Sequence, residues 1–136
     1  MKYIFLDFDG VLNDHTVYEN GYTGTKPSCV RVLNSVLREY PDTKLVIISS
    51  WRYLVHSGQM TLKGFESLML THGINAHNRV IGLTREDRDD TRYEQILDWL
   101  NTHDPNCQSW ISLDDNYLSD DPRCVLTNGR TGLCLT

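Results

Sequence analysis

Short apolar runs alternate with longer amphipathic stretches along the chain. The runs are rich in β-branched and aromatic residues and have the length of buried strands. They comprise residues 3–6, 44–49, 79–83, 110–113 and 123–127, of which 79–83 would equally suit an extended loop. Asn20 and Gly21, between aromatic and β-branched neighbours, predict a small β-hairpin over residues 17–23 that would form a flap beside the first strand.

The stretches between the runs carry apolar residues at helical spacing, over residues 27–40, 62–72 and 91–100. Thr61 and Thr91 stand where an N-cap is needed, and Glu94 completes a capping box with Thr91. Strands that alternate with helices predict an α/β fold with a mostly parallel central sheet. Because the sequence contains no repeat or linker, we expect a single domain over residues 1–136.

The composition is that of one globular domain, with 136 residues of which 40% are hydrophobic and 23% charged. No apolar stretch approaches the roughly 20 residues that span a bilayer. The first predicted strand begins so early that a signal peptide has no room before it. The four cysteines are far apart, which argues against a disulfide framework or a cysteine zinc site. We therefore expect reduced thiols and a cytoplasmic location.

Two carboxylates, Asp7 and Asp9, follow the first apolar run directly, and Gly10 closes the turn. Open α/β sheets bind their ligands at the carboxyl ends of the strands, which is where these side chains would project. Two acids this close repel each other, so the arrangement is typical of a cation site or of a nucleophile and an acid with separate roles. For this motif alone, an Asp-rich turn without a function is an equal alternative.

Other polar residues follow later strands in the same way. Ser49 and Ser50 come at the end of the second run, and Asp114 and Asp115 come directly after residues 110–113. Taken singly, a serine here is more often a helix cap or loop residue, and an acidic pair is more often a turn. Because parallel strands end at one edge of a sheet, the three groups together predict a site.

These motifs resemble those of the haloacid dehalogenase (HAD) superfamily, most of whose members are phosphohydrolases. The matching segments are Asp-Phe-Asp-Gly-Val-Leu at residues 7–12, the strand-end serines and Leu-Asp-Asp at 113–115. The resemblance implies a Rossmann-like, three-layer fold. It also implies that Asp7 attacks phosphorus to form an aspartyl-phosphate, and that Asp9 protonates the leaving oxygen and later activates water. Members that remove halogens lack a carboxylate at the second position, so Asp9 favours phosphoryl chemistry.

The resemblance also implies the residues that contact the phosphoryl group. Ser49, with Ser50 as the second choice, would donate a hydrogen bond to a phosphoryl oxygen. Gly10 and Arg52 are further candidates for substrate binding.

A basic residue before the last catalytic strand would neutralise the transferring group. Arg85, Arg88 and Arg92 all lie in range. We prefer Arg92, because the first turn of a well-patterned helix would fix its position, although a cation there opposes the helix dipole. Arg85 and Arg88 lie in a charged loop, where a solvated surface role is the stronger alternative.

The acidic pair would complete a Mg²⁺ site, since this ion prefers oxygen ligands in octahedral geometry. The resemblance assigns it a side-chain oxygen of Asp7, the backbone carbonyl of Asp9 and a carboxylate oxygen of Asp115. Asp114 would lie behind these ligands or bind through a water molecule, and Asp120 is a weaker candidate.

A narrower resemblance points to the substrate. Ser-Ser-Trp-Arg at 49–52 and Thr-Gly-Leu at 131–133 are similar to segments of the small HAD domains found in RNA-repair proteins. The gaps between the motifs are too short for a separate cap domain, so an open site could admit a polynucleotide terminus. Cations near the crevice and aromatic rings that stack on a base would then bind it. The candidates are Arg52, Arg85, Arg88, Lys63, Trp51, Tyr18 and Tyr22.

The net charge of −5, from 13 basic and 18 acidic residues, argues against a protein that grips a long nucleic-acid backbone. Recognition of a terminus alone is compatible with it. The alternatives are a metabolite or phosphoprotein phosphatase and a non-catalytic module that binds Mg²⁺ or phosphate. Intact Asp7 and Asp9 argue against the last of these.

Overall fold

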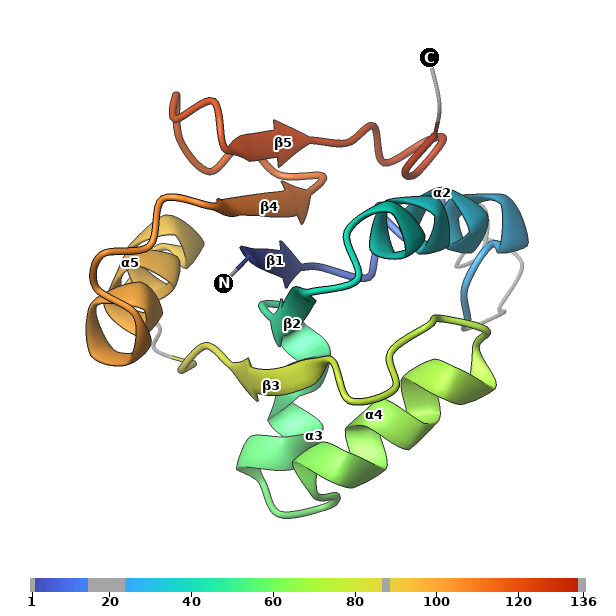
Figure 1. Ribbon diagram of the computed structural model, residues 1–136, viewed down its shortest axis with the longest axis horizontal. Helices are drawn as coiled ribbons and strands as arrows, with labels where there is room; N and C mark the ends of the chain where they lie inside the picture. The colour runs from blue at the N-terminus through green and yellow to red at the C-terminus, as the bar shows by residue number, and fades with distance from the viewer. Residues whose placement is uncertain (1, 15–23, 87–88, 135–136) are drawn as a thin grey trace.

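Five parallel strands form the central sheet in a computed structural model that describes residues 2–14, 24–86 and 89–134. In chain order the strands are β1 (Lys2–Leu6), β2 (Thr43–Ile47), β3 (Val80–Leu83), β4 (Trp110–Asp114) and β5 (Cys124–Leu126). Their order across the sheet is β3-β2-β1-β4-β5, so the first strand of the chain lies in the middle (Figure 1). Residues 79–83, for which the sequence allowed a loop, thus contain a true strand.

The central strand β1 is apolar on both faces. Ile4 and Leu6 pack into one core, whereas Tyr3 and Phe5 pack into the other. On its two sides β1 pairs with β2 and with β4, both in parallel. Parallel neighbours require crossover connections, and these place helices on the faces of the sheet.

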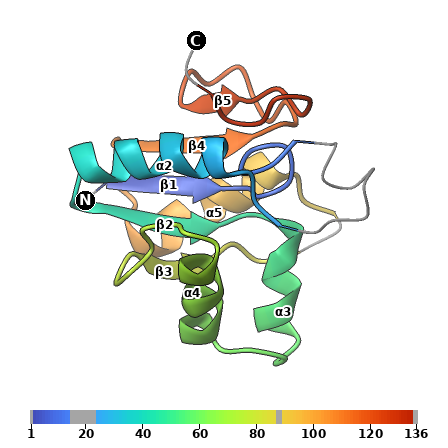
Figure 2. The ribbon, with the colours of Figure 1, turned by 90° about the vertical axis from the view of Figure 1, so that its right-hand side faces the viewer.

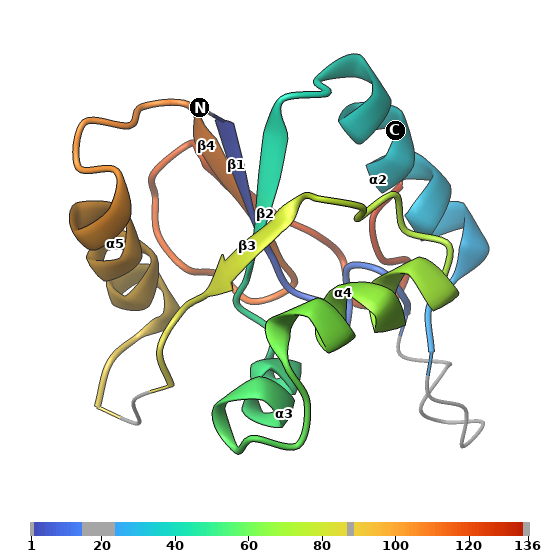
Figure 3. The same cartoon turned by 60° about the horizontal axis from the view of Figure 1, so that its bottom comes forward.

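Helices cover both faces and make the fold three-layered. α2 (Pro27–Glu39) and α4 (Leu62–Thr71) lie on one face, and α5 (Arg92–His103) lies on the other (Figures 1 and 3). The first core contains Leu33 and Leu37 of α2 together with Phe65 and Met69 of α4. The second contains buried residues of α5, namely Ile96, Trp99 and Leu100. The predicted α/β architecture is confirmed, and the described sheet is entirely parallel.

The predicted helix caps are present. Thr61 Oγ1 accepts a hydrogen bond from the Gly64 N–H at 3.0 Å, and Thr91 Oγ1 accepts one from the Glu94 N–H at 3.1 Å. Each such cap contributes about 1 kcal/mol to helix stability. The cap at Thr91 matters most for the site, because it fixes where α5 begins and therefore where Arg92 lies.

Two short helical turns between β2 and α4 were not predicted. They are η1 (Ser50–Arg52) and α3 (Tyr53–His56), which are too short to show an apolar period. Tertiary contacts hold them: a ring nitrogen of His56, Nε2, lies 3.1 Å from the carbonyl oxygen of Thr84 at the end of β3. No separate cap domain lies between the strands in the described ranges. The hairpin predicted over residues 17–23 falls outside them.

Among the described residues, no helix is long and apolar enough to cross a membrane.

Candidate active site

The site lies where the order of strands reverses. From β1 the chain moves outward through β2 to β3, then returns to β4 on the other side of β1. The connection after β1 therefore runs toward β2, whereas the connection after β4 runs the opposite way, toward β5. Open α/β sheets form ligand crevices at such a point, outside the carboxyl ends of the two strands. Figure 2 shows the carboxyl ends of the strands at one edge of the sheet, beside α3 and the loop that follows β1.

Strand register brings the predicted acids together at this point. Leu6 and Leu113 are paired residues of β1 and β4, and the Asp7 N–H donates to the Leu113 carbonyl oxygen at 3.0 Å. Asp7 therefore lies beside Asp114, the last residue of β4. One carboxylate oxygen from each of Asp7, Asp114 and Asp115 lies within 4.8 Å of the other two. Asp7 is 3% exposed and Asp114 is 1% exposed, so two of the three acids are withdrawn from water.

Gly10 makes room for the third acid. It has a φ of +78°, and a Cβ at this position would lie 2.2 Å from Asp115 Oδ2. Any side chain would therefore push the Asp115 carboxylate away from the loop after β1. The space that Gly10 leaves for Asp115 and the three carboxylate groups fit Mg²⁺, which binds through a few carboxylates and retains water.

Arg92 is the first residue of α5, and it reaches the acids from the face of the sheet that α5 covers. Its Nη1 lies 2.6 Å from Asp114 Oδ2 and 3.1 Å from Asp7 Oδ2. Burial lowers the pKa of this guanidinium, but the two carboxylates outweigh burial and raise its pKa above the ordinary value. Arg92, the preferred candidate from the sequence, is thus a fixed cation that contacts both buried acids.

The carboxyl group of Asp7 titrates far from its ordinary range. Burial and the neighbouring charge of Asp114 raise its pKa to about 7, although Arg92 and the backbone N–H of Phe8 act in the opposite direction. Desolvation disfavours the ionised form, and a second acid adds to that cost. A cation bound among these acids would favour ionised Asp7.

This raised pKa predicts how stability depends on pH without metal. Between the ordinary aspartate pKa of 3.8 and about 7, the folded state retains a proton that the unfolded chain has released. Stability should therefore fall as pH rises through this range. We expect the Tm of Asp7→Asn minus that of the wild type, measured in EDTA, to be small at about pH 4 and to increase up to about pH 7. A difference that is constant with pH would contradict the assignment.

The acid-bearing loop after β1 is held by a residue that the sequence did not indicate. Asn13 is buried, and its side chain contacts the Gly10 N–H and the Asp9 carboxylate. Asp9 itself is partly buried. Nothing in the spacing of the motif separates Asn13 from an ordinary turn residue, because its partners depend on how the turn folds.

Ser49 lies at the end of β2, where the sequence placed a phosphate contact. It is fully buried, and its Oγ accepts a hydrogen bond from the Trp51 N–H at 3.2 Å as the cap of η1. A hydroxyl that accepts in this way still has its own proton to donate. Ser50, the second choice, is exposed.

Arg52 is buried beneath the site, with 6% of its surface exposed. Its guanidinium donates to the Ile48 carbonyl oxygen, to Thr84 Oγ1 at 3.1 Å and to Gln95 Oε1 at 2.9 Å. Burial and the nearby charge of Arg92 lower the pKa of Arg52. These contacts join the ends of β2 and β3 to α5, so Arg52 supports the site whether or not it also contacts substrate.

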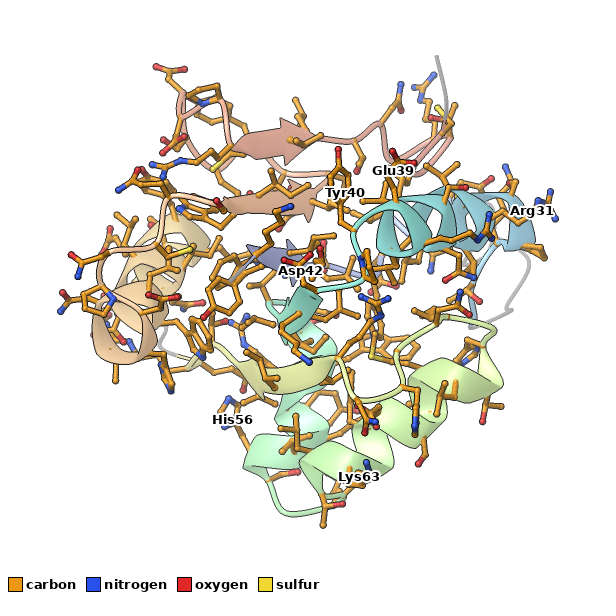
Figure 4. All side chains as sticks on the ribbon, viewed as in Figure 1. Arg31, Glu39, Tyr40, Asp42, His56 and Lys63 are labelled. Carbon is orange, nitrogen blue, oxygen red and sulfur yellow. The ribbon has the colours of Figure 1, made fainter. Side chains whose placement is uncertain are left out.

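The remaining candidates in the described ranges have partners other than the three clustered acids, and others fall outside those ranges. Arg85 is half-exposed and pairs with Asp90 and Asp98, and Asp120 accepts a hydrogen bond from Tyr117. Trp51 packs edge-on against Phe8, with ring centroids 5.2 Å apart. Lys63 lies on α4, away from β4 and β5 (Figure 4). Three candidates fall outside the described ranges: Tyr18, Tyr22 and Arg88.

Buried acids at the switch point of a parallel sheet, with an arginine held against them, define an α/β domain whose acid cluster could hold a metal ion. The family described as the HAD domain in Swiss Army Knife RNA repair proteins matches residues 3–135. The chain belongs to this family, whose HAD domain is in general that of a phosphohydrolase, and the resemblance found in the motifs is confirmed. No curated protein and no solved structure gave a match.

Proposed function

We propose that the protein is a Mg²⁺-dependent phosphomonoester hydrolase that works through an aspartyl-phosphate and acts on phosphorylated nucleic-acid ends. The observation that carries the proposal is the position of Asp7 at the carboxyl end of β1. Its carboxylate lies within 4.8 Å of that of Asp114 and 3.1 Å from Arg92 Nη1. Asp7 is a buried carboxylate whose ionised form is favoured by the adjacent guanidinium of Arg92. Such a group suits nucleophilic attack on phosphorus.

The reaction would proceed in two displacements. In the first, a carboxylate oxygen of Asp7 bonds to phosphorus, the ester P–O bond breaks, and Asp9 gives its proton to the leaving oxygen. In the second, Asp9 takes a proton from water, the resulting hydroxide attacks phosphorus, and phosphate leaves with Asp7 regenerated. Arg92 would stabilise the negative charge on the transferring group, and the Ser49 hydroxyl would donate to one of its oxygens.

The metal site would consist of the Asp7 and Asp115 side chains and the Asp9 carbonyl, with Asp114 behind them. When bound, the ion would neutralise charge on the phosphoryl oxygens. The oxygen donors gathered within 4.8 Å and the space that Gly10 leaves for Asp115 support this assignment.

The substrate class is supported by the description of the family and by two exposed aromatic residues near the carboxyl ends of the strands. Tyr53 is the first residue of α3, directly after η1, and Tyr117 lies in the loop after β4, two residues beyond Asp115. Both rings are exposed, and Tyr117 is 66% exposed. Such rings can stack on an unpaired base. With a net charge of −5, the protein would contact few phosphates, so binding should be weak and only slightly dependent on salt.

Phosphate release tests the substrate class. We expect short 3′- or 5′-phosphorylated oligonucleotides to be hydrolysed with a higher kcat/KM than mononucleotides or sugar phosphates. Tyr117→Ala should lower kcat/KM for oligonucleotides by about tenfold, since stacking contributes about 1–3 kcal/mol per base, and should spare sugar phosphates. The matched control is Tyr40→Ala, which removes an exposed tyrosine after the carboxyl end of α2 (Figure 4). A preference above about tenfold for a sugar phosphate or mononucleotide would indicate a metabolite phosphatase instead.

A further inference from the structure

The Asn13 side chain forms three hydrogen bonds that hold the loop carrying Asp7 and Asp9. It is 2% exposed and lies four residues after Asp9. Its Oδ1 accepts from the Gly10 N–H at 2.9 Å, and its Nδ2 lies 2.9 Å from the Gly24 carbonyl oxygen and 3.2 Å from Asp9 Oδ1. All the groups of this carboxamide are thus engaged, and one partner is the proposed acid and base.

The orientation of the amide follows from its partners. A backbone N–H can only donate, so the atom that faces Gly10 must be the oxygen. The Gly24 carbonyl can only accept, so the atom on the other side must be the nitrogen, whose second hydrogen faces Asp9. A carboxylate at position 13 would keep the bond from Gly10 and lose both donors. Asparagine is therefore specifically suited to this position.

The amide is anchored independently of Asp9. The Gly10 peptide is held from both sides, because its N–H donates to Asn13 and its carbonyl oxygen accepts from Thr127 Oγ1 at 2.7 Å. The Gly24 carbonyl fixes the amide nitrogen at a third point. Asn13 can thus impose a direction on the Asp9 side chain rather than follow it.

We propose that Asn13 is a positioning residue that decides which oxygen of Asp9 exchanges the proton, an inference that rests on the function proposed above. The Nδ2–H donates to Asp9 Oδ1 whether the carboxyl group is ionised or neutral, so Oδ1 remains an acceptor throughout. The proton must then be carried by Oδ2. In the first displacement that proton moves from Oδ2 to the leaving oxygen, and in the second Oδ2 accepts a proton from water.

The dependence of rate on the leaving group tests this role. Proton donation matters greatly when the leaving alcohol is a poor one, and little when it is an activated phenol. We expect Asn13→Asp to lower kcat/KM for alkyl phosphates by about 100-fold, within the range that general acid catalysis contributes. For nitrophenyl phosphates the loss should be less than about fivefold. Asn13→Ala, which also removes the acceptor for Gly10, should show the same divergence with a lower Tm.

Thr127→Val is the matched control, because it removes the other hydrogen bond to Gly10 and leaves the contact between Asn13 and Asp9. Thr127→Val should reduce kcat/KM by the same factor for all phosphate esters, whatever the leaving group. Mg²⁺ affinity, measured by calorimetry, should be nearly unchanged in Asn13→Asp if only the Asp9 side chain is misplaced.

The outcomes separate this inference from the proposed function. If the wild type hydrolyses no phosphomonoester, the proposed function fails. If the wild type is active but Asn13→Asp lowers kcat/KM by the same factor for every leaving group, the inference is overturned. If Asn13→Asp fails to fold, Asn13→Ala decides: an equal loss for all leaving groups overturns the inference as well. In either case Asn13 serves the fold alone.

Discussion

Asp7→Asn is expected to lower turnover by several orders of magnitude while the protein remains folded. The amide has nearly the size of the carboxylate but cannot form an acyl-phosphate, so the covalent route is lost. The measurement is kcat with a nitrophenyl phosphate in saturating Mg²⁺. Trapping the intermediate by acid quench from a labelled substrate should give a phosphoprotein in the wild type and none in the variant.

The matched control is Asp120→Asn, which changes an aspartate of the β4–β5 loop that contacts Tyr117 rather than the acid cluster. It should retain wild-type turnover. An Asp7→Asn enzyme within about tenfold of the wild type would exclude the aspartyl-phosphate mechanism.

Removal of divalent metal should abolish activity, and added Mg²⁺ should restore it. Without a cation, Asp7, Asp114 and Asp115 gather three carboxyl groups in one crevice, next to the guanidinium of Arg92 and the more distant charge of Arg52. Asp115→Ala should weaken Mg²⁺ binding, whereas Asp120→Ala should leave the affinity close to that of the wild type. Calorimetric titration with Mg²⁺ measures both, independently of any substrate.

Two results would contradict the metal assignment. One is full activity in excess EDTA. The other is an equal loss of Mg²⁺ affinity in the Asp115 and Asp120 variants, which would place the ion elsewhere in the loop after β4.

The strand ends were the most predictable part of this protein. A parallel sheet aligns the carboxyl ends of its strands, so Asp7, Ser49 and Asp114 could be placed at one edge from the apolar runs that precede them. The start of α5 was predictable from local sequence, because Thr91 caps the helix and so fixes where Arg92 lies.

The supporting contacts could not be predicted, because they join residues far apart in the sequence. Arg52 reaches Gln95 on α5, and Thr127 reaches Gly10. Neither partner is implied by local spacing, since each pair depends on how separate elements dock. Sequence patterns therefore located the chemistry, whereas the contacts that hold it in place required the structure.

The central position of β1 has a consequence for the order of folding. This strand is synthesised before the other four, yet its Tyr3 pairs with Trp110 of β4, which leaves the ribosome only after β2 and β3. Because synthesis adds about 5–20 residues per second, one edge of the apolar strand β1 would remain unpaired for several seconds until β4 is made. Pairing between such distant segments also makes folding slow, because a long loop must close first. The acid cluster is shared between these two strands, so the site cannot assemble until β4 has docked beside β1.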